Sequence, residues 1–157
     1  MNPILHVVLF EPEIPLNTGS IGRTCVASGA KLWLVRPLGF RIDDRRLRRA
    51  GLDYWKHLDW EVMDDWMSLQ AAIGPQPIWL VETRGDRLYT QANYRHGDAL
   101  VFGSESRGLP HSLLAEYAER TLRVPIRSEA CSLNLANVAS VVVFEALRQI
   151  QSWPAPE

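Results

Sequence analysis

Three polar residues interrupt the start of an otherwise apolar segment near the end of the chain. The stretch SEACSLNLANVASVVVFEALRQ, residues 128–149, places Ser132, Asn134 and Asn137 around Leu133 and Leu135. A buried polar group without a partner costs about 1–3 kcal/mol. A helix normally needs one polar residue at its start, where the side chain accepts a backbone hydrogen bond. One such cap does not account for three polar residues.

Two glycines follow an apolar run in a second stretch, LVFGSESRGLP. Gly103 and Gly108 let the backbone approach a ligand or adopt a conformation closed to other residues, although a simple turn explains them equally well. The fingerprints GxGxxG and GxxxxGK[ST] are absent from the sequence. Their absence argues against a dinucleotide-binding oxidoreductase and against a P-loop enzyme.

A third stretch, NTGSIGR, combines an amide side chain with a basic one. It places Asn17 at a predicted helix start and Arg23 about one and a half turns into that helix. Residues of these types more often have a structural role, in which Asn17 would cap the helix and Arg23 would be a solvated side chain. This stretch alone does not identify a function.

A basic run, RIDDRRLRR, gathers four arginines on one side of a helical turn. Within it, Leu47 faces away from the arginines, which share about 160° of arc. The four residues are Arg45, Arg46, Arg48 and Arg49. A solvated amphipathic turn is one interpretation. Phosphate binding is the other, because guanidinium groups bind phosphate through two parallel hydrogen bonds.

A metal centre and a disulfide are both unexpected. The four histidines show no HxxxH pairing and have no cysteine or carboxylate at ligand spacing. Cys25 and Cys131 lie far apart without a CxxC pattern, so we expect two reduced thiols.

The composition is that of one soluble domain, which we expect to span residues 1–157. Hydrophobic residues make up 46% of the chain and charged residues 22%. A formal net charge of -1 gives no general attraction to nucleic acid or membranes, so any such attraction needs a local patch. No apolar run approaches the ~20 residues that span a bilayer, and the first residues lack the basic start of a signal peptide. We therefore expect a cytoplasmic protein with no membrane partner.

Apolar runs that alternate with helix-like segments predict how these residues are positioned. The runs predict strands at residues 6–10, 31–35, 77–81, 99–103 and 121–125, with 59–63 as a candidate for a further strand. Predicted helices lie at residues 20–28, 65–73, 110–117 and 133–150. This alternation is typical of an α/β fold with a mostly parallel sheet and helices on both faces. The polar loops follow strand ends, the edge where such sheets bind ligands.

The last predicted helix carries a narrow polar stripe. Asn134, Asn137, Glu145 and Arg148 fall within about 80° of one another, and apolar residues fill most of the rest. The pattern predicts deep burial. It does not distinguish a helix in the core of one chain from a helix that also packs on a second subunit.

Taken together, the three stretches resemble the three motifs of SPOUT-class RNA 2'-O-ribose methyltransferases, in order and in spacing. LFEPEIPLNTG and RRLRRAGLDYW are also similar to the small single-domain branch that methylates the wobble ribose, of cytidine or uridine, in certain transfer RNAs. The likeness covers almost the entire chain. It implies a C-terminal deep trefoil knot, a homodimer that packs C-terminal helices together, and the tRNA anticodon stem-loop as the substrate.

The resemblance also implies which residues form the site. S-adenosylmethionine is expected against the knotted loops, at Val81, Gly103, Gly108, Val124, Ser132 and Leu133. The resemblance implies catalytic roles for Arg23, Glu105 and Asn134. It implies that Asn17 and the four arginines of the basic run bind the substrate. Because arginine stays protonated, we expect Arg23 to hold a phosphate and to stabilise the developing alkoxide. The final proton acceptor is left open.

Some features of the sequence leave alternatives. Ser20 and Ala136 stand where many relatives have asparagine and serine, and Phe144 stands where some have tyrosine, which removes a hydroxyl group. The alternatives are a non-catalytic RNA-binding module on the same fold, a methyltransferase for another tRNA or rRNA position, and a small-molecule methyltransferase. The arginine run argues weakly against the last. We expect Gly103→Val to weaken cofactor binding and to leave the fold largely intact.

Overall fold

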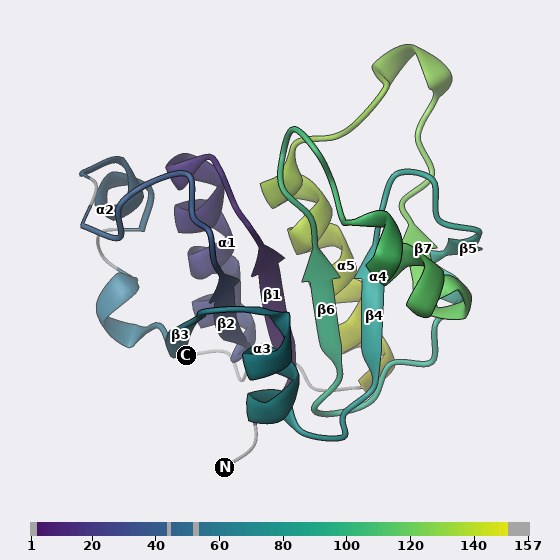
Figure 1. Ribbon diagram of the computed structural model, residues 1–157, viewed down its shortest axis with the longest axis horizontal. Helices are drawn as coiled ribbons and strands as arrows, with labels where there is room; N and C mark the ends of the chain where they lie inside the picture. Colours follow the sequence, from purple (N-terminus) through teal and green to yellow (C-terminus); the bar gives the residue numbers. More distant parts are fainter. Residues whose placement is uncertain (1–2, 44, 52–53, 151–157) are drawn as a thin grey trace.

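A parallel sheet forms the centre of the protein. The computed structural model describes residues 3–43, 45–51 and 54–150. In this part of the chain the strand order is β3-β2-β1-β6-β4-β7-β5, and every neighbouring pair is parallel (Figure 1). The strands are β1 (His6–Phe10), β2 (Lys31–Val35), β3 (Trp60–Met63), β4 (Ile78–Val81), β5 (Arg87–Leu88), β6 (Ala99–Phe102) and β7 (Thr121–Arg123). The predicted α/β class with a parallel sheet is confirmed.

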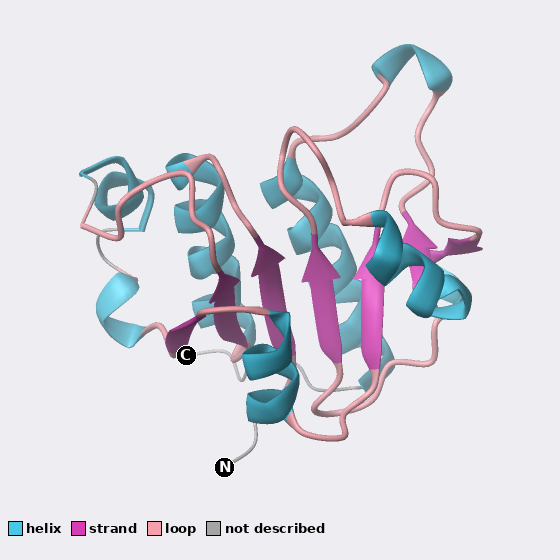
Figure 2. Ribbon diagram, viewed as in Figure 1, coloured by secondary structure: helices cyan, strands magenta, loops and turns pink. Residues whose placement is uncertain are grey.

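Helices cover both faces of the sheet (Figure 2). On one face lie α1 (Pro15–Ser28) and α5 (Leu135–Ile150), and on the other α3 (Trp66–Ile73) and α4 (His111–Glu116), whereas α2 (Arg45–Gly51) packs on α1. Neighbouring strand residues alternate between the two cores, so that Leu9 packs with α1 and α5 and Val8 with α3 and α4. Short 3₁₀ turns complete the chain: η1 (Trp55–His57), η2 (Tyr89–Gln91), η3 (Ala118–Arg120) and η4 (Ser128–Ala130).

Most predicted boundaries lie close to the observed ones. The strands predicted at 6–10 and 31–35 have the observed ends, and the other predicted strands are one or two residues too long. The sequence does not predict β5, because two residues at the sheet edge that pair with β7 leave no periodic pattern.

The largest difference is the start of α1, which begins at Pro15 rather than at residue 20. Proline suits the first turn of a helix, where its missing N–H is not needed. Ile14 precedes the helix and makes no capping side-chain bond. Instead, the carboxylate of Glu105 accepts hydrogen bonds from the backbone N–H groups of Glu13 (2.8 Å) and Ile14 (3.1 Å). The structural interpretation of Asn17 as the cap of this helix therefore does not hold, and Asn17 lies within the first turn.

The loop after β4 closes tightly on β7. Although β4 and β5 both precede β7 in the sequence, β7 lies between them in the sheet. A Cβ atom at Gly85 would lie 2.6 Å from the backbone carbonyl carbon of Leu122. Any side chain at this position would therefore push the loop away from the strand.

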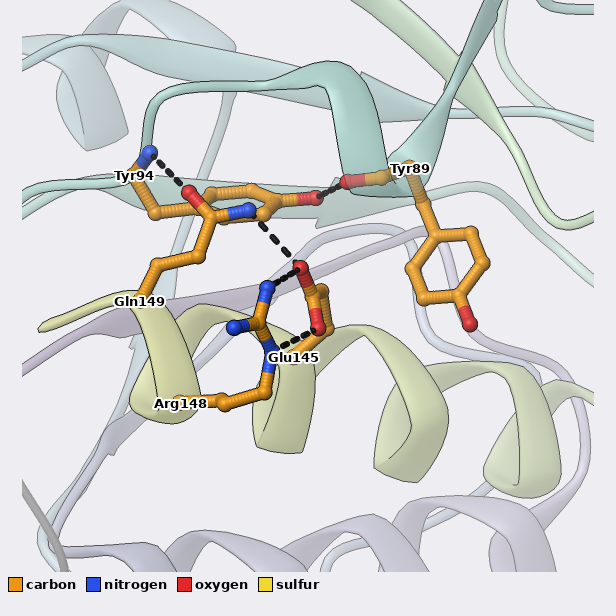
Figure 3. Close-up of polar contacts among 5 residues, drawn as sticks. All are labelled: Tyr89, Tyr94, Glu145, Arg148 and Gln149. Atoms are coloured by element: carbon orange, nitrogen blue, oxygen red, sulfur yellow. Dashed lines mark hydrogen bonds and ion pairs between the residues drawn. The ribbon is translucent and has the colours of Figure 1, made fainter. Parts of the chain in front are cut away.

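A polar network fastens the end of α5 to the segment that follows β5 (Figure 3). Glu145 accepts hydrogen bonds from Arg148 Nε (2.8 Å), Arg148 Nη2 (2.9 Å) and Gln149 Nε2 (2.8 Å). The side chain of Gln149 in turn accepts a bond from the backbone N–H of Tyr94 (3.2 Å), and the Tyr94 hydroxyl donates to the carbonyl of Tyr89 (2.6 Å). Burial, with the nearby Glu145 charge, raises the pKa of Tyr94.

Two apolar side chains of α5 remain exposed. Val141 is 39% exposed and Phe144 is 40% exposed, so the predicted deep burial of this helix is incomplete within one chain. Leu16, near the start of the neighbouring α1, is 52% exposed. This pattern favours the interpretation in which α5 also packs on a second subunit.

Candidate active site

A cleft of about 820 Å³ opens at the carboxyl ends of the strands. Its walls come from the loops after β4, β6 and β7 and from the first turns of α1 and α5. It brings together most of the residues predicted for the site, namely Asn17, Val81, Gly103, Glu105, Gly108, Val124, Ser132, Leu133 and Asn134. Leu133 is 42% exposed there, and an exposed leucine in a cleft is typical of a surface that binds an apolar part of a ligand.

Gly103 is required by the backbone around it. Ser104 and Gly108 exchange backbone hydrogen bonds, which fold the loop back on itself. A Cβ at Gly103 would lie 2.2 Å from the backbone carbon of Gly108 and 2.5 Å from the backbone nitrogen of Leu109. The expectation that Gly103→Val leaves the fold largely intact is wrong, because this loop would have to open.

Glu105 connects the second motif to the first. Besides its two bonds to the backbone before α1, its carboxylate accepts a bond from Asn17 Nδ2 (3.3 Å). Carboxylates are stabilised at helix N-termini, which carry a partial positive charge. Its hydrogen bonds thus make Glu105 a helix cap supplied from a distant loop.

Asn134 connects the third motif to the same chain of hydrogen bonds. Its Oδ1 accepts bonds from the backbone N–H groups of Ala136 (2.9 Å) and Asn137 (3.4 Å), so it caps α5. Its Nδ2 donates to Asn17 Oδ1 (3.0 Å). The polar side chain of Asn134 is thus explained by a cap and by a link to α1.

Glu82 and Arg84 are among the charged residues of the cleft that were not predicted from the sequence. Glu82 follows β4, and its carboxylate accepts bonds from the backbone N–H groups of Thr83 (3.0 Å) and Leu109 (3.1 Å), which joins two walls of the cleft. Arg84, two residues further on, is exposed and also lines the cleft. Their position directly after a predicted strand, at the ligand edge of the sheet, is the signal that identifies them.

Arg23 does not line the cleft. Its exposed side chain turns to the segment after α2, where Nη2 donates a hydrogen bond to the hydroxyl of Tyr54 (3.1 Å). Its guanidinium carbon lies 4.6 Å from the centre of the Tyr54 ring. Within one chain, therefore, the structure does not bring Arg23 together with Glu105 and Asn134.

The basic run forms α2, which has a buried side and an exposed side, as predicted. Leu47 is fully buried against the rest of the protein, whereas Arg45, Arg46 and Arg49 are exposed. The side chain of Arg48 lies outside the described residues. Because α2 packs on α1, these arginines are on the same part of the molecule as Arg23 and away from the cleft walls.

The cysteines are free thiols. Cys25 is buried in the core and Cys131 is exposed at the cleft. Burial raises the pKa of the Cys25 thiol. Among the described residues, no cluster of histidine, cysteine and acidic side chains is placed to hold a metal ion, and no helix is long and apolar enough to cross a membrane.

Comparison with known proteins identifies relatives over nearly the whole length. Residues 4–144 match the SpoU rRNA Methylase family. The chain belongs to this family. Among SpoU-family relatives, a protein of Saccharophagus degradans is 46% identical over 155 residues, which cover 94% of this chain and 96% of the relative, and it is named tRNA (cytidine(34)-2'-O)-methyltransferase. The predicted resemblance is confirmed.

Solved structures of SpoU-type proteins share the fold. A structure described as giving insights into the 2-OH methylation of C/U34 on tRNA has a TM-score of 0.89 and 42% identity, and the match covers 95% of this chain and 97% of that one. The SpoU methyltransferase AviRb of Streptomyces viridochromogenes, solved with the cofactor AdoMet, has a TM-score of 0.79 and 27% identity over 95% of this chain and 61% of its own.

Proposed function

We propose that this SpoU-family protein methylates the ribose 2'-oxygen of the wobble nucleotide, cytidine or uridine 34, in the tRNA anticodon loop. The observation that carries the proposal is the identity of 46% along nearly the full length to a tRNA (cytidine(34)-2'-O)-methyltransferase. The cleft formed by the three motifs agrees with it. Because the proposed substrate is tRNA, we place the enzyme in the cytoplasm. We also propose that residues 1–157 form a single domain.

The cleft fits S-adenosylmethionine, which supplies the methyl group when it is bound. A volume of about 820 Å³ lies within the range of roughly 300–1,000 Å³ typical of small-molecule sites. Phe102, Leu133 and Val138 give it apolar walls. We propose that the cofactor is held by Val81, Gly103, Gly108, Val124, Ser132 and Leu133, all of which line the cleft.

The polar motif residues hold the cleft in shape. We propose that Glu105, Asn17 and Asn134 act as one hydrogen-bonded unit that fixes the loop after β6 and the starts of α1 and α5 around the ligand. Since the Glu105 carboxylate is already occupied by backbone donors, positioning describes it better than proton transfer.

The proposed role of Arg23 requires a dimer, in which Arg23 of one copy reaches the cleft of the other. Val141 and Phe144 of α5 and Leu16 of α1 are exposed apolar side chains that a second copy would cover. Arg23 is exposed on α1 and lies outside the cleft of its own chain. We therefore propose that it acts at the cleft of the second copy, where it holds a phosphate and stabilises negative charge on the 2'-oxygen.

We also propose that the C-terminal segment forms a trefoil knot. Two observations support it: β7 lies between β4 and β5, and Gly85 of the intervening loop packs directly on the β7 backbone. In addition, Gln149 at the end of α5 accepts a hydrogen bond from the backbone N–H of Tyr94, in the segment after β5 (Figure 3).

The anticodon stem-loop is proposed to bind across α2. Arg45, Arg46 and Arg49 are exposed there, and Arg48 belongs to the same run. A local basic helix supplies phosphate contacts that the net charge of -1 does not.

Methyl transfer to defined tRNAs tests the function. Purified protein, S-adenosylmethionine and unmodified tRNA transcripts are incubated, and digested nucleosides are analysed by mass spectrometry. We expect a 2'-O-methylated cytidine or uridine, and we expect no product when nucleotide 34 already carries a 2'-O-methyl group. A methyl group at another position would overturn the proposed substrate. Binding of cofactor and tRNA without transfer would instead favour a non-catalytic RNA-binding module.

A further inference from the structure

The guanidinium group of Arg23 is held by a tyrosine. Arg23 Nη2 donates a hydrogen bond to the Tyr54 hydroxyl (3.1 Å), and the guanidinium carbon lies 4.6 Å from the ring centre. The two residues come from different elements, since Arg23 is on α1 and Tyr54 directly precedes η1. We propose that Tyr54 is a positioning residue that sets the plane and direction of Arg23 for the RNA substrate, a role that rests on the proposed function.

The place of Tyr54 beside Arg23 is fixed by close packing between α1 and η1. Gly22 and Trp55, the neighbours of these two residues in the chain, meet at this contact, and a Cβ at Gly22 would lie 3.2 Å from the Trp55 ring. Trp55 also packs against Trp60 of β3, with ring centres 5.1 Å apart. Tyr54 therefore stands on a part of the protein anchored to both α1 and the sheet.

This arrangement leaves Arg23 able to bind a ligand while restricting its motion. The guanidinium group has five N–H donors, and the hydrogen bond to Tyr54 uses one of them. An exposed arginine otherwise samples many rotamers, and a donor aimed in advance stabilises developing negative charge more effectively than one that must be ordered during the reaction. Stacking over an aromatic ring adds a second, directional attraction.

The surroundings fit RNA as the ligand. Tyr54 follows α2 in the chain, and α2 packs on the helix that carries Arg23. An RNA strand whose phosphates contact the arginines of α2 would thus pass close to both Tyr54 and Arg23. Tyr54 is 36% exposed, so it is accessible on this surface.

The test separates the tyrosine hydroxyl from the tyrosine ring. Tyr54→Phe keeps the ring and removes the acceptor of the Arg23 bond. Tyr117→Phe is the matched control, because the Tyr117 hydroxyl accepts a bond from Gln70 (3.0 Å) on the opposite face of the sheet. In single-turnover methyl transfer with saturating tRNA and S-adenosylmethionine, we expect Tyr54→Phe to be about tenfold slower, and Tyr117→Phe to keep the wild-type rate.

A double substitution decides whether Tyr54 acts through Arg23. In an Arg23→Ala background, Tyr54→Phe should cause no further loss, since no guanidinium group is left to position. A second tenfold loss in that background would overturn the proposal, because Tyr54 would then contact the RNA by itself. A wild-type rate for the single variant Tyr54→Phe would overturn it as well.

A measurement without substrate keeps the inference separate from the proposed function. NMR relaxation reports the order parameter of the Arg23 Nε–H bond, which we expect to fall in Tyr54→Phe and to stay unchanged in Tyr117→Phe. An equal order parameter in wild type and Tyr54→Phe would refute the positioning role. If order falls but the wild-type protein transfers no methyl group to tRNA, the proposed function fails while Tyr54 still orients Arg23.

Discussion

Replacing Glu105 by glutamine tests whether this carboxylate is a helix cap or a catalytic base. The carboxylate accepts two backbone hydrogen bonds before α1 and one from Asn17. Glutamine keeps the size of the side chain and one acceptor oxygen. It presents an NH₂ group to a backbone donor, however, and it removes a negative charge from the positive end of the helix.

The expected loss follows from these contacts. A hydrogen bond to a charged group contributes about 1.5–3 kcal/mol, and a charge at a helix end about 0.3–1 kcal/mol. Because Glu105 is only half-buried, water compensates part of this, and we expect Glu105→Gln to lower the free energy of unfolding by about 2–3 kcal/mol. For a chain of this size, that corresponds to a fall in Tm of about 5–10 °C.

Urea unfolding, followed by tryptophan fluorescence, measures this loss, and single-turnover methyl transfer is measured on the same variant. Glu61→Gln is the control, since Glu61 is 51% exposed and pairs with Lys31 on the surface (2.8 Å), a contact worth at most about 1 kcal/mol. A Glu105→Gln variant with wild-type stability but no methyl transfer would refute the cap and identify Glu105 as a proton acceptor.

Three further predictions concern the loop after β6, the end of α5 and the arginine helix. Gly103→Ala should lower the urea midpoint far more than Gly74→Ala, because a Cβ at Gly103 meets backbone at 2.2 Å, whereas a Cβ at Gly74 has nothing within 4 Å. Gly74 adopts a backbone conformation (φ 77°, ψ -155°) that is nearly confined to glycine, so its replacement should cost about 1–3 kcal/mol, and similar midpoints for the two variants would contradict this prediction. Hydrogen bonds from Arg148 lower the pKa of Glu145 below its usual 4.5. The stability that Glu145 contributes is therefore present at pH 7 and is lost as the pH falls below 4.5. The difference in unfolding free energy between wild type and Glu145→Gln should therefore shrink from pH 6 to pH 3, and a constant difference would exclude this linkage. Replacing Arg45 and Arg49 by glutamine should weaken tRNA binding and flatten its salt dependence by about one unit of slope per lost contact, whereas an unchanged slope would make α2 merely a solvated helix.

The strands could be predicted because their signal is local. Strands buried on both faces read as continuous apolar runs, and the runs at 6–10 and 31–35 have the observed ends. The start of α1 could not be predicted in the same way, because its cap comes from Glu105, 91 residues from Ile14 in the sequence. A cap supplied by tertiary structure leaves no pattern in the residues that it caps.

The candidate site was only partly accessible to sequence reasoning. The motifs identify Asn17, Glu105 and Asn134, but spacing does not reveal that these side chains bond to one another. Nor does it reveal that Arg23 points to Tyr54 and away from the cleft. Apolar residues of a core helix and of a subunit interface look alike in sequence, so the exposure of Phe144 and its neighbours could not be predicted either.

Three of the motif residues that line the cleft also join its loops to one another. Glu105, Asn17 and Asn134 form one hydrogen-bonded chain that spans all three motifs, so much of their polar capacity is used within the protein. The rest of the cleft surface combines apolar side chains such as Leu133 with polar ones such as Arg84 and Ser132. The shape of a site built this way depends on the positions of its loops. We therefore expect the hydrogen bonds of Asn134 to affect ligand binding through the loop positions, which gives this residue a structural reason to be polar at the start of the apolar C-terminal segment.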